Sequence, residues 1–181
     1  MTTRLITDTA AEVEAMSPER QIRLYAVLAR DLTYPLRFDV NVINRSQASW
    51  VLDEITQGGG TYNGMESEVV LDIVECALAM ACSVRVGRQS SPVVIIKTPA
   101  SANDQERAAI YSELATMATA AYADEISLEI HDRTEAWYED GEFKPTDTAL
   151  ESTKSLHEKY PGSHDGEWRP NFMTDLRLWW D

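Results

Sequence analysis

The side chains that could do chemistry are concentrated in one acidic segment between positions 124 and 142. Alternate side chains of a β-strand share one face, so this segment is expected to hold carboxylates as a fixed acidic surface. Such a surface can occupy a basic nucleic-acid channel on another protein, through complementary potential and counterion release. A solvated face that only aids solubility is the alternative interpretation. Eight carboxylates stand there beside a single base, Arg133: Asp124, Glu125, Glu129, Asp132, Glu135, Glu139, Asp140 and Glu142.

An enzyme site is the second kind of chemistry that the sequence allows. The chain has three histidines, His131, His157 and His164. A divalent-metal hydrolase could be assembled from His157, His164, Asp165 and Glu167, but the His-x-x-x-His and His-Glu-x-x-His spacings are missing. A Gly-x-Ser-x-Gly elbow, a Walker loop and a Gly-x-Gly-x-x-Gly fingerprint are also missing. The sequence therefore favours a protein without catalytic residues, bound metal or cofactor.

The two cysteines, Cys76 and Cys82, point to the same conclusion. They lie six residues apart in a predicted helix, so their side chains diverge by roughly 240° around its axis and a disulfide is not expected. Neither has a Cys-x-x-Cys partner or a nearby histidine that would suggest a metal site. We expect both to be small buried hydrophobic residues in a reducing compartment.

Charge narrows the range of partners. The 181 residues carry a formal charge of −14, and residues 91–181 hold 18 acids but 8 bases. This balance argues against direct binding to nucleic acid or to an anionic membrane surface, both of which require lysine and arginine.

The first residues lack the apolar core of a secretory signal, and the most apolar stretch, 69–81, is too short and too charged to span a bilayer. A cytoplasmic location is expected.

The elements up to residue 60 are predicted to form a helical N-terminal unit. Ser17 followed by Pro18 is typical of a helix start, and residues 36–42 are expected to form a loop or a short strand. A second helix is predicted to begin at Asn44, with Gln47 completing a capping box, and to end at Gly58. The glycines from 58 to 64 are the best candidate for a hinge. The buried face of this second helix is predicted to hold Ala48, Val51, Leu52 and Ile55.

Residues 61–181 are predicted to form an α+β core. Helices are expected over residues 65–82, 103–122 and 148–160, with the second of these placing Ile110, Leu114, Met117 and Ala121 inward. A small, mostly antiparallel sheet is expected over about residues 84–98 and 125–144, with strand 93–96 buried and 125–132 half-buried. Asp140-Gly141 predicts a hairpin turn. The two units are also compatible with one continuous domain.

The last 14 residues are rich in large apolar side chains. Such a tail either docks back on the core or, where it stays exposed, marks a partner or self-association surface. Both interpretations remain open from the sequence. The residues concerned are Trp168, Phe172, Leu176, Leu178, Trp179 and Trp180.

One segment also carries a resemblance. The helix predicted to begin at Asn44 is similar to the sequence pattern Leu-Thr-Lys-x-Glu-Ala-Ser-x-x-Ile-Asp-x-Leu. The residues at matching positions are Ile43, Asn44, Arg45, Gln47, Ala48, Ser49, Leu52, Asp53 and Ile55. Residues 20–57 thereby resemble a helix–loop–helix module of uncharacterised function that is frequent in phage and actinobacterial proteins. The resemblance implies a phage or mobile-element origin and a part in assembly or docking, and it carries no catalytic residues. Simple packing of the second helix on the first would also explain these residues.

Together these features favour a non-enzymatic acidic protein that binds a basic protein or nucleoprotein complex. In the more specific form of this hypothesis, the protein mimics nucleic acid and thereby inhibits a host defence complex that handles nucleic acid. The alternatives are a phage assembly protein that forms homo-oligomers through its tail, and the metal-dependent hydrolase. The expected partner-binding residues are Glu125, Glu129, Asp132, Glu135, Trp137, Tyr138, Glu139, Asp140, Trp179 and Trp180.

Overall fold

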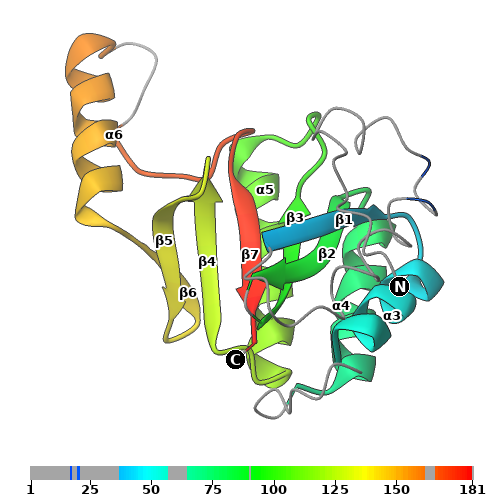
Figure 1. Cartoon of the computed structure of the whole chain (residues 1–181). Coiled ribbons are helices and arrows are strands. Elements are labelled where there is room, and N and C mark those ends of the chain that lie inside the picture. Colours follow the sequence, from blue (N-terminus) through cyan, green and yellow to red (C-terminus); the bar gives the residue numbers. More distant parts are fainter. Residues whose placement is uncertain are drawn as a thin grey trace, which may run out of the picture.

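The chain folds around one antiparallel sheet (Figure 1). The computed structural model describes residues 17, 20, 37–56, 65–89, 91–161 and 166–180. Within these residues the sheet has seven strands in the order β1-β2-β3-β7-β4-β5-β6. The strands are β1 (Arg37–Val42), β2 (Ser83–Gln89), β3 (Ser91–Lys97), β4 (Glu125–Ile130), β5 (Arg133–Glu139), β6 (Glu142–Pro145) and β7 (Asp175–Trp179). The predicted α+β fold is confirmed, with a larger sheet than expected because β1 and β7 join it.

Strand β7 comes last in the described sequence but lies in the middle of the sheet. It pairs with β3 on one side and with β4 on the other, so that Arg177 is opposite both Ile95 and Ser127. Its alternating residues Leu176 and Leu178 are fully buried. The tail therefore docks into the core through Leu176, Leu178 and Trp180, the first of the two interpretations that the sequence left open, while Phe172 stays 64% exposed.

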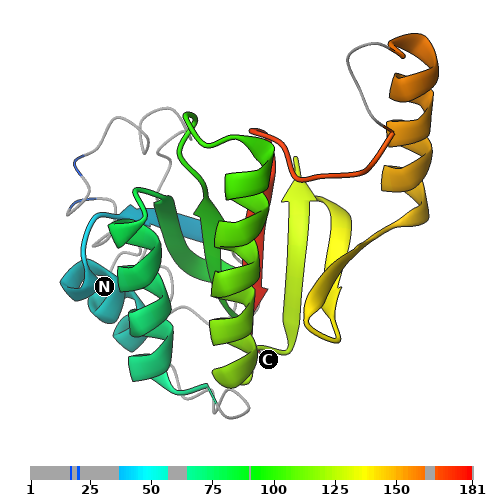
Figure 2. The ribbon, with the colours of Figure 1, turned by 180° about the vertical axis from the view of Figure 1, so that it is seen from behind.

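Four helices are described. They are α3 (Arg45–Thr56), α4 (Ser67–Ala79), α5 (Asp104–Ala120) and α6 (Asp147–Lys159). The first three lie against one face of the sheet, while α6 projects beyond the β5–β6 edge (Figures 1 and 2). The helix predicted after Ser17 and the hinge predicted from Gly58 lie outside the described residues. No helix in the described part of the chain is long and apolar enough to cross a membrane.

Local sequence explains where the helices begin. The Gln47 amide donates to Asn44 Oδ1 at 2.9 Å, and Gln47 Oε1 accepts from the Ile43 amide at 3.1 Å, so the predicted cap is present with its return bond one residue earlier. Asn103 and Glu106 form a full capping box at the start of α5. The predicted buried face of α3 is confirmed, since Ala48, Val51, Leu52 and Ile55 are all buried.

The core lies between the sheet and the three covering helices. Alternate strand residues point toward α3, α4 and α5 and form one continuous apolar cluster with them. Trp180 closes the cluster at its end: its side chain is fully buried, and its indole Nε1 donates to the Ala121 carbonyl at 2.9 Å. On α5 the fully buried residues are Tyr111, Leu114, Ala115 and Ala118, whereas Ile110 and Met117 of the predicted face are only partly buried.

Two tight hairpins form the outer half of the sheet. Asp140 and Gly141 have φ of 54° and 89° and connect β5 to β6, as the Asp-Gly pair predicted. His131 and Asp132 have φ of 50° and 60° and connect β4 to β5 in the same left-handed conformation. This second turn therefore uses two residues with side chains where asparagine and glycine are preferred.

Candidate functional site

The sheet face that points away from α3, α4 and α5 carries a hollow of about 370 Å³. The alternation that buries Leu176 and Leu178 places Asp175 and Arg177 on this opposite face. The hollow lies where β1, β2, β3, β7 and β4 run side by side, next to the β4–β5 turn. We call it the outer-face hollow; it is lined by Asp39, Arg85, Ile95, Lys97, Glu129, His131, Asp132, Met173 and Asp175.

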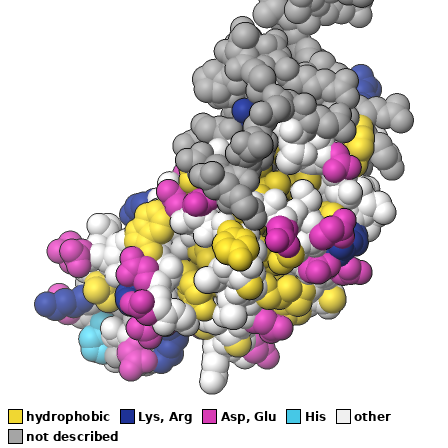
Figure 3. All heavy atoms as spheres, turned by 90° about the horizontal axis from the view of Figure 1, so that it is seen from below, with side chains coloured by type: hydrophobic (Ala, Val, Ile, Leu, Met, Phe, Trp, Pro, Cys, Tyr) yellow, Lys and Arg dark blue, Asp and Glu magenta, His cyan; other side chains and the backbone are white. Residues whose placement is uncertain are grey.

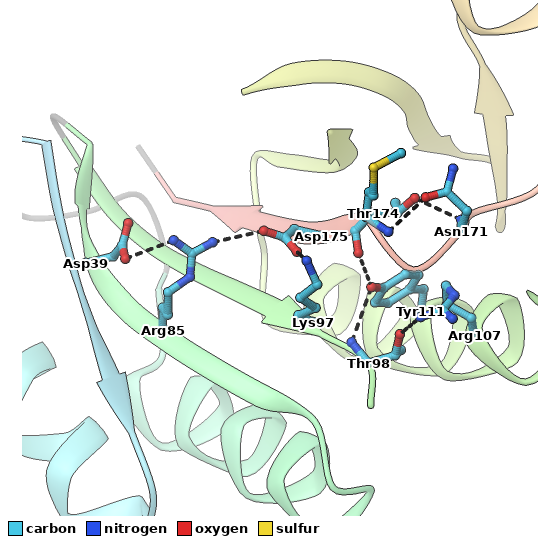
Figure 4. A network of polar contacts seen from close by, with 10 residues as sticks. Asp39, Arg85, Lys97, Thr98, Arg107, Tyr111, Asn171, Thr174 and Asp175 are labelled. Atoms are coloured by element: carbon cyan, nitrogen blue, oxygen red, sulfur yellow. Dashed lines mark hydrogen bonds and ion pairs between the residues drawn. The ribbon is translucent and has the colours of Figure 1, made fainter. Parts of the chain in front are cut away.

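A chain of ion pairs crosses the hollow from β1 to β7 (Figure 4). Arg85 Nη1 donates to Asp39 Oδ1 at 3.1 Å, and Arg85 Nη2 donates to Asp175 Oδ2 at 2.9 Å. Lys97 Nζ lies 3.6 Å from the other oxygen of Asp175, Oδ1. That oxygen is buried and has no hydrogen-bond partner, because 3.6 Å exceeds the normal range for such a bond. The Asp175 carboxylate is therefore paired with two cations, although one of its oxygens accepts no hydrogen bond.

The backbone beside Asp175 is held firmly by helix α5 (Figure 4). The buried Tyr111 hydroxyl donates to the Thr174 carbonyl at 2.5 Å and accepts from the Thr98 amide at 3.4 Å. The Thr174 hydroxyl in turn accepts from the Asn171 amide at 3.0 Å. These bonds fix the start of β7 against the end of β3, so the Asp175 and Lys97 side chains start from a rigid frame.

A second set of charges lies on the neighbouring strands. Arg177 Nη1 donates to Glu125 at 3.0 Å, and Arg177 Nε lies 3.7 Å from Glu129. The Ser127 hydroxyl donates to Glu129 at 3.2 Å. Burial nevertheless raises the pKa of Glu129, and the negative charges of Asp132 and Glu125 raise it further, against the lowering effects of Arg177 and Ser127. Glu129 is therefore a carboxylate whose negative charge is incompletely compensated.

Acids exceed bases in the hollow. Arg85 and Lys97 face four carboxylates, those of Asp39, Glu129, Asp132 and Asp175. Only Asp39 and Asp175 are paired with those two cations. Chemically, the arrangement suits a positively charged group that would approach Glu129 and Asp132.

Several of the residues predicted to bind a partner are not available at the surface. Glu135 is buried and forms an ion pair of 2.6 Å with Arg133. Trp180 is fully enclosed in the core, because it fills the space between the sheet and α5. Tyr138 faces the helices, where it packs edge-on against Phe143 and shares a hydrogen bond of 2.9 Å with Thr116. Glu135 and Trp180 are therefore buried, whereas Tyr138 is half-buried and lies on the helix-covered side of the sheet.

The remaining predicted residues fall into two groups. Glu129 and Asp132 lie at the outer-face hollow, whereas Glu139 and Asp140 lie at the other end of the hairpin. Lys144 Nζ is 3.5 Å from Glu139 and 2.6 Å from Asp140, and it lowers the pKa of Asp140 by a direct hydrogen bond. The structure thus divides the expected single acidic surface, since successive turns lie at opposite ends of their strands.

The three other predicted residues, Glu125, Trp137 and Trp179, lie on the strands between these two ends. Glu125 is paired with Arg177, whose guanidinium also stacks over the Trp179 ring at 5.8 Å from its centroid. Trp137 lies opposite Ser127 and is partly exposed. These residues connect the two acidic ends through a strip that contains aromatic rings.

Sequence reasoning missed four residues of the hollow, Asp39, Arg85, Lys97 and Asp175. They come from four strands, and the sheet register brings them together. The alternation of polar and apolar residues over 175–179 was the one local signal, since it is typical of a strand with one buried face.

The hydrolase interpretation gains no support from the described residues. His131 is on the β4–β5 turn and His157 is on α6, while His164 and Asp165 lie outside the described part of the chain. The described residues contain no group of three or more histidine, cysteine, aspartate or glutamate side chains that could hold a metal ion. Burial raises the pKa of Cys82 to about 11, so this thiol stays protonated and unreactive near neutral pH.

Comparison with known proteins adds no relative. No family model, no curated protein and no solved structure matches this chain. Its function therefore has to be inferred from the site itself.

Proposed function

We propose that this chain is a non-enzymatic binding protein that engages a basic protein surface through the outer face of its sheet. The observation that carries the proposal is the incompletely compensated carboxylate charge of the outer-face hollow. Glu129 and Asp132 line the hollow without an ion pair to Arg85 or Lys97, and burial together with like charges raises the pKa of Glu129. A lysine or arginine side chain from a partner would supply the missing counter-charge.

Physical chemistry favours such an anchor over the rest of this face. Charge-assisted hydrogen bonds between arginine or lysine and carboxylates are about twice as strong as neutral ones. They gain further strength where burial has already removed the carboxylate from water, as at Glu129. The ion pairs of Asp39 with Arg85 and of Glu125 with Arg177 hold the surrounding acids in place before a partner arrives.

A more specific form of the proposal is that the partner is a nucleic-acid-handling defence complex of a host, and that this chain, from a phage or mobile element, inhibits it by nucleic-acid mimicry. The acid excess of the chain and the resemblance of residues 20–57 to a phage module support this form. It requires that the partner lose its nucleic-acid binding when this chain is bound.

The first experiment is an affinity pull-down from the lysate of the native host, with and without nuclease, followed by mass spectrometry. The proposal expects one basic protein or complex that resists nuclease and is released by salt, because salt screens exposed charges. The double variant Glu129→Gln/Asp132→Asn should lose this partner. The matched control Glu113→Gln/Glu151→Gln, which removes two exposed helical acids away from the hollow, should keep it.

Two results would count against the proposal. Recovery of the bait alone would remove the basis for a protein partner. Equal retention of a partner by the hollow variant and by the control would show that binding does not use the outer-face hollow.

A further inference from the structure

A second groove lies on the helical side of the molecule, between α3 and α4. It has a volume of about 330 Å³ and is lined by Arg45, Ser46, Ser49, Trp50, Asp53, Glu68 and Leu71. We call it the α3–α4 groove. It is separate from the outer-face hollow, because α3 and α4 cover the opposite face of the sheet (Figure 2).

The wall of the α3–α4 groove keeps a negative charge after all its ion pairs are formed. Arg45 donates to Glu68 at 2.7 Å, to Asp72 at 2.5 Å and to Glu75 at 3.1 Å. One guanidinium therefore serves three carboxylates, and its bonds to Asp72 and Glu68 raise the pKa of Arg45, so that it stays fully charged. Asp53 adds a further exposed carboxylate to the same groove.

The three carboxylates that Arg45 binds still face solvent. Their side chains are between 59% and 83% exposed, with spare oxygen lone pairs for further donors. In the view from below, one of the groups of acidic side chains lies around a basic side chain on the side of α3 and α4 (Figure 3). The local field therefore attracts a cation even though Arg45 is present.

Trp50 supplies the apolar part of the groove. Its side chain is 36% exposed on α3, one helical turn before Asp53. A lysine or arginine held over an indole ring gains cation–π attraction, and a carboxylate beside the ring can bind its charged end at the same time. Ser46 and Ser49 add hydroxyl groups that can accept further N–H donors.

We propose that the α3–α4 groove is a docking site for an arginine- or lysine-bearing segment of a partner protein. Charge complementarity selects this occupant, since the groove combines an exposed indole with carboxylates in excess over their single cation. A second copy of this chain is a poor occupant, because two molecules of charge −14 repel each other. The site is independent of the proposed function, which uses the other face of the sheet.

The test is a titration of the whole ¹⁵N-labelled chain with an N-acetylated peptide of four Gly-Arg repeats, followed by NMR. The indole N–H signals of the five tryptophans are assigned with single Trp→Phe variants. We expect the Trp50 indole and the amides of residues 45–53 and 68–75 to shift, and the shifts to weaken with added salt.

Trp50→Ala should weaken peptide binding by about threefold or more, from the loss of cation–π attraction. Tyr122→Ala is the matched control, because Tyr122 is an exposed aromatic residue that lines neither the α3–α4 groove nor the outer-face hollow. Thermal melts that match the wild type keep both comparisons valid, and Trp50→Leu, which also lacks an aromatic ring, replaces Trp50→Ala if the latter fails to fold.

Absence of any signal shift at high peptide concentration would overturn the proposal. Shifts that cluster at Glu129 and Asp132 and are also seen in the Trp50→Ala variant would overturn it as well. The second result would leave the proposed function standing. Binding lost in Trp50→Ala but kept in Glu129→Gln/Asp132→Asn would support the groove alone.

Discussion

Replacing Asp132 by glycine should make the protein more stable while weakening its binding to a basic partner. Asp132 and His131 occupy the left-handed region at φ 60° and 50° in the β4–β5 turn. A residue with a side chain costs roughly 1–2 kcal/mol there, and glycine relieves this but loses about 0.5–1 kcal/mol through the entropy of the unfolded chain. The net gain is about 0.5–1 kcal/mol. For a chain of this length that raises Tm by about 1–4 °C.

The same substitution also removes a negative charge from the outer-face hollow. Asp132 raises the pKa of Glu129, so removing it relieves a like-charge repulsion as well as backbone strain. Asp132→Asn separates the two effects, because asparagine tolerates the left-handed region but carries no charge. Scanning calorimetry and partner titration on both variants are the assays. A loss of stability in Asp132→Gly would refute the strain estimate, and unchanged binding in both variants would refute the role of the charge.

Three further perturbations have definite expected outcomes. Because the pKa of Glu129 is raised on folding, its protonated form stabilises the fold below pH 4.5 and this contribution is lost as pH rises through the folded pKa. Glu129→Gln should therefore unfold at a higher urea concentration than the wild type at pH 7 but not at pH 4. A variant that is more resistant to urea at pH 4 but not at pH 7 would contradict a raised pKa of Glu129. Trp180→Ala should cost about 3–5 kcal/mol, whereas the half-exposed neighbour Trp179→Ala should cost clearly less by urea titration. Truncation after Pro170 should unfold the protein, because it removes β7, and circular dichroism would show the loss of structure. A folded, monomeric product would contradict this prediction and would support a role of the tail in self-association.

Local patterns predicted the elements whose partners are close in sequence. The sheet residues of 84–98, the Asp140-Gly141 turn and the apolar face of α3 were all predictable, because turn residues and periodicity act within a few positions. Strand β7 was not identified, although Asp175 to Trp179 alternates as a strand should. Its pairing with β3 joins residues about 80 positions apart, and no local signal specifies such a partner.

The candidate site was only half predictable for a related reason. The sequence shows where carboxylates are dense, but it does not show which cations reach them. Arg177 and Lys144 lie outside the acidic segment 124–142, on the strands next to β4 and β5, and pair with Glu125, Glu139 and Asp140. Glu129 and Asp132 stay available because the β4–β5 turn places them where acids from other strands outnumber the cations.

The fold therefore decides which part of the acid excess can act on a partner. Where a cation lies beside an acid, as Arg133 does beside the buried Glu135 on β5, the charges cancel and the pair serves the structure. Where one cation is shared among several acids, as Arg45 is, negative charge remains and is held in a rigid position. Rigid, incompletely neutralised carboxylates are better anchors for a basic side chain than freely solvated ones, because little conformational freedom is lost on binding. By this criterion the outer-face hollow and the α3–α4 groove, rather than the most acidic stretch of the sequence, are the surfaces to test first.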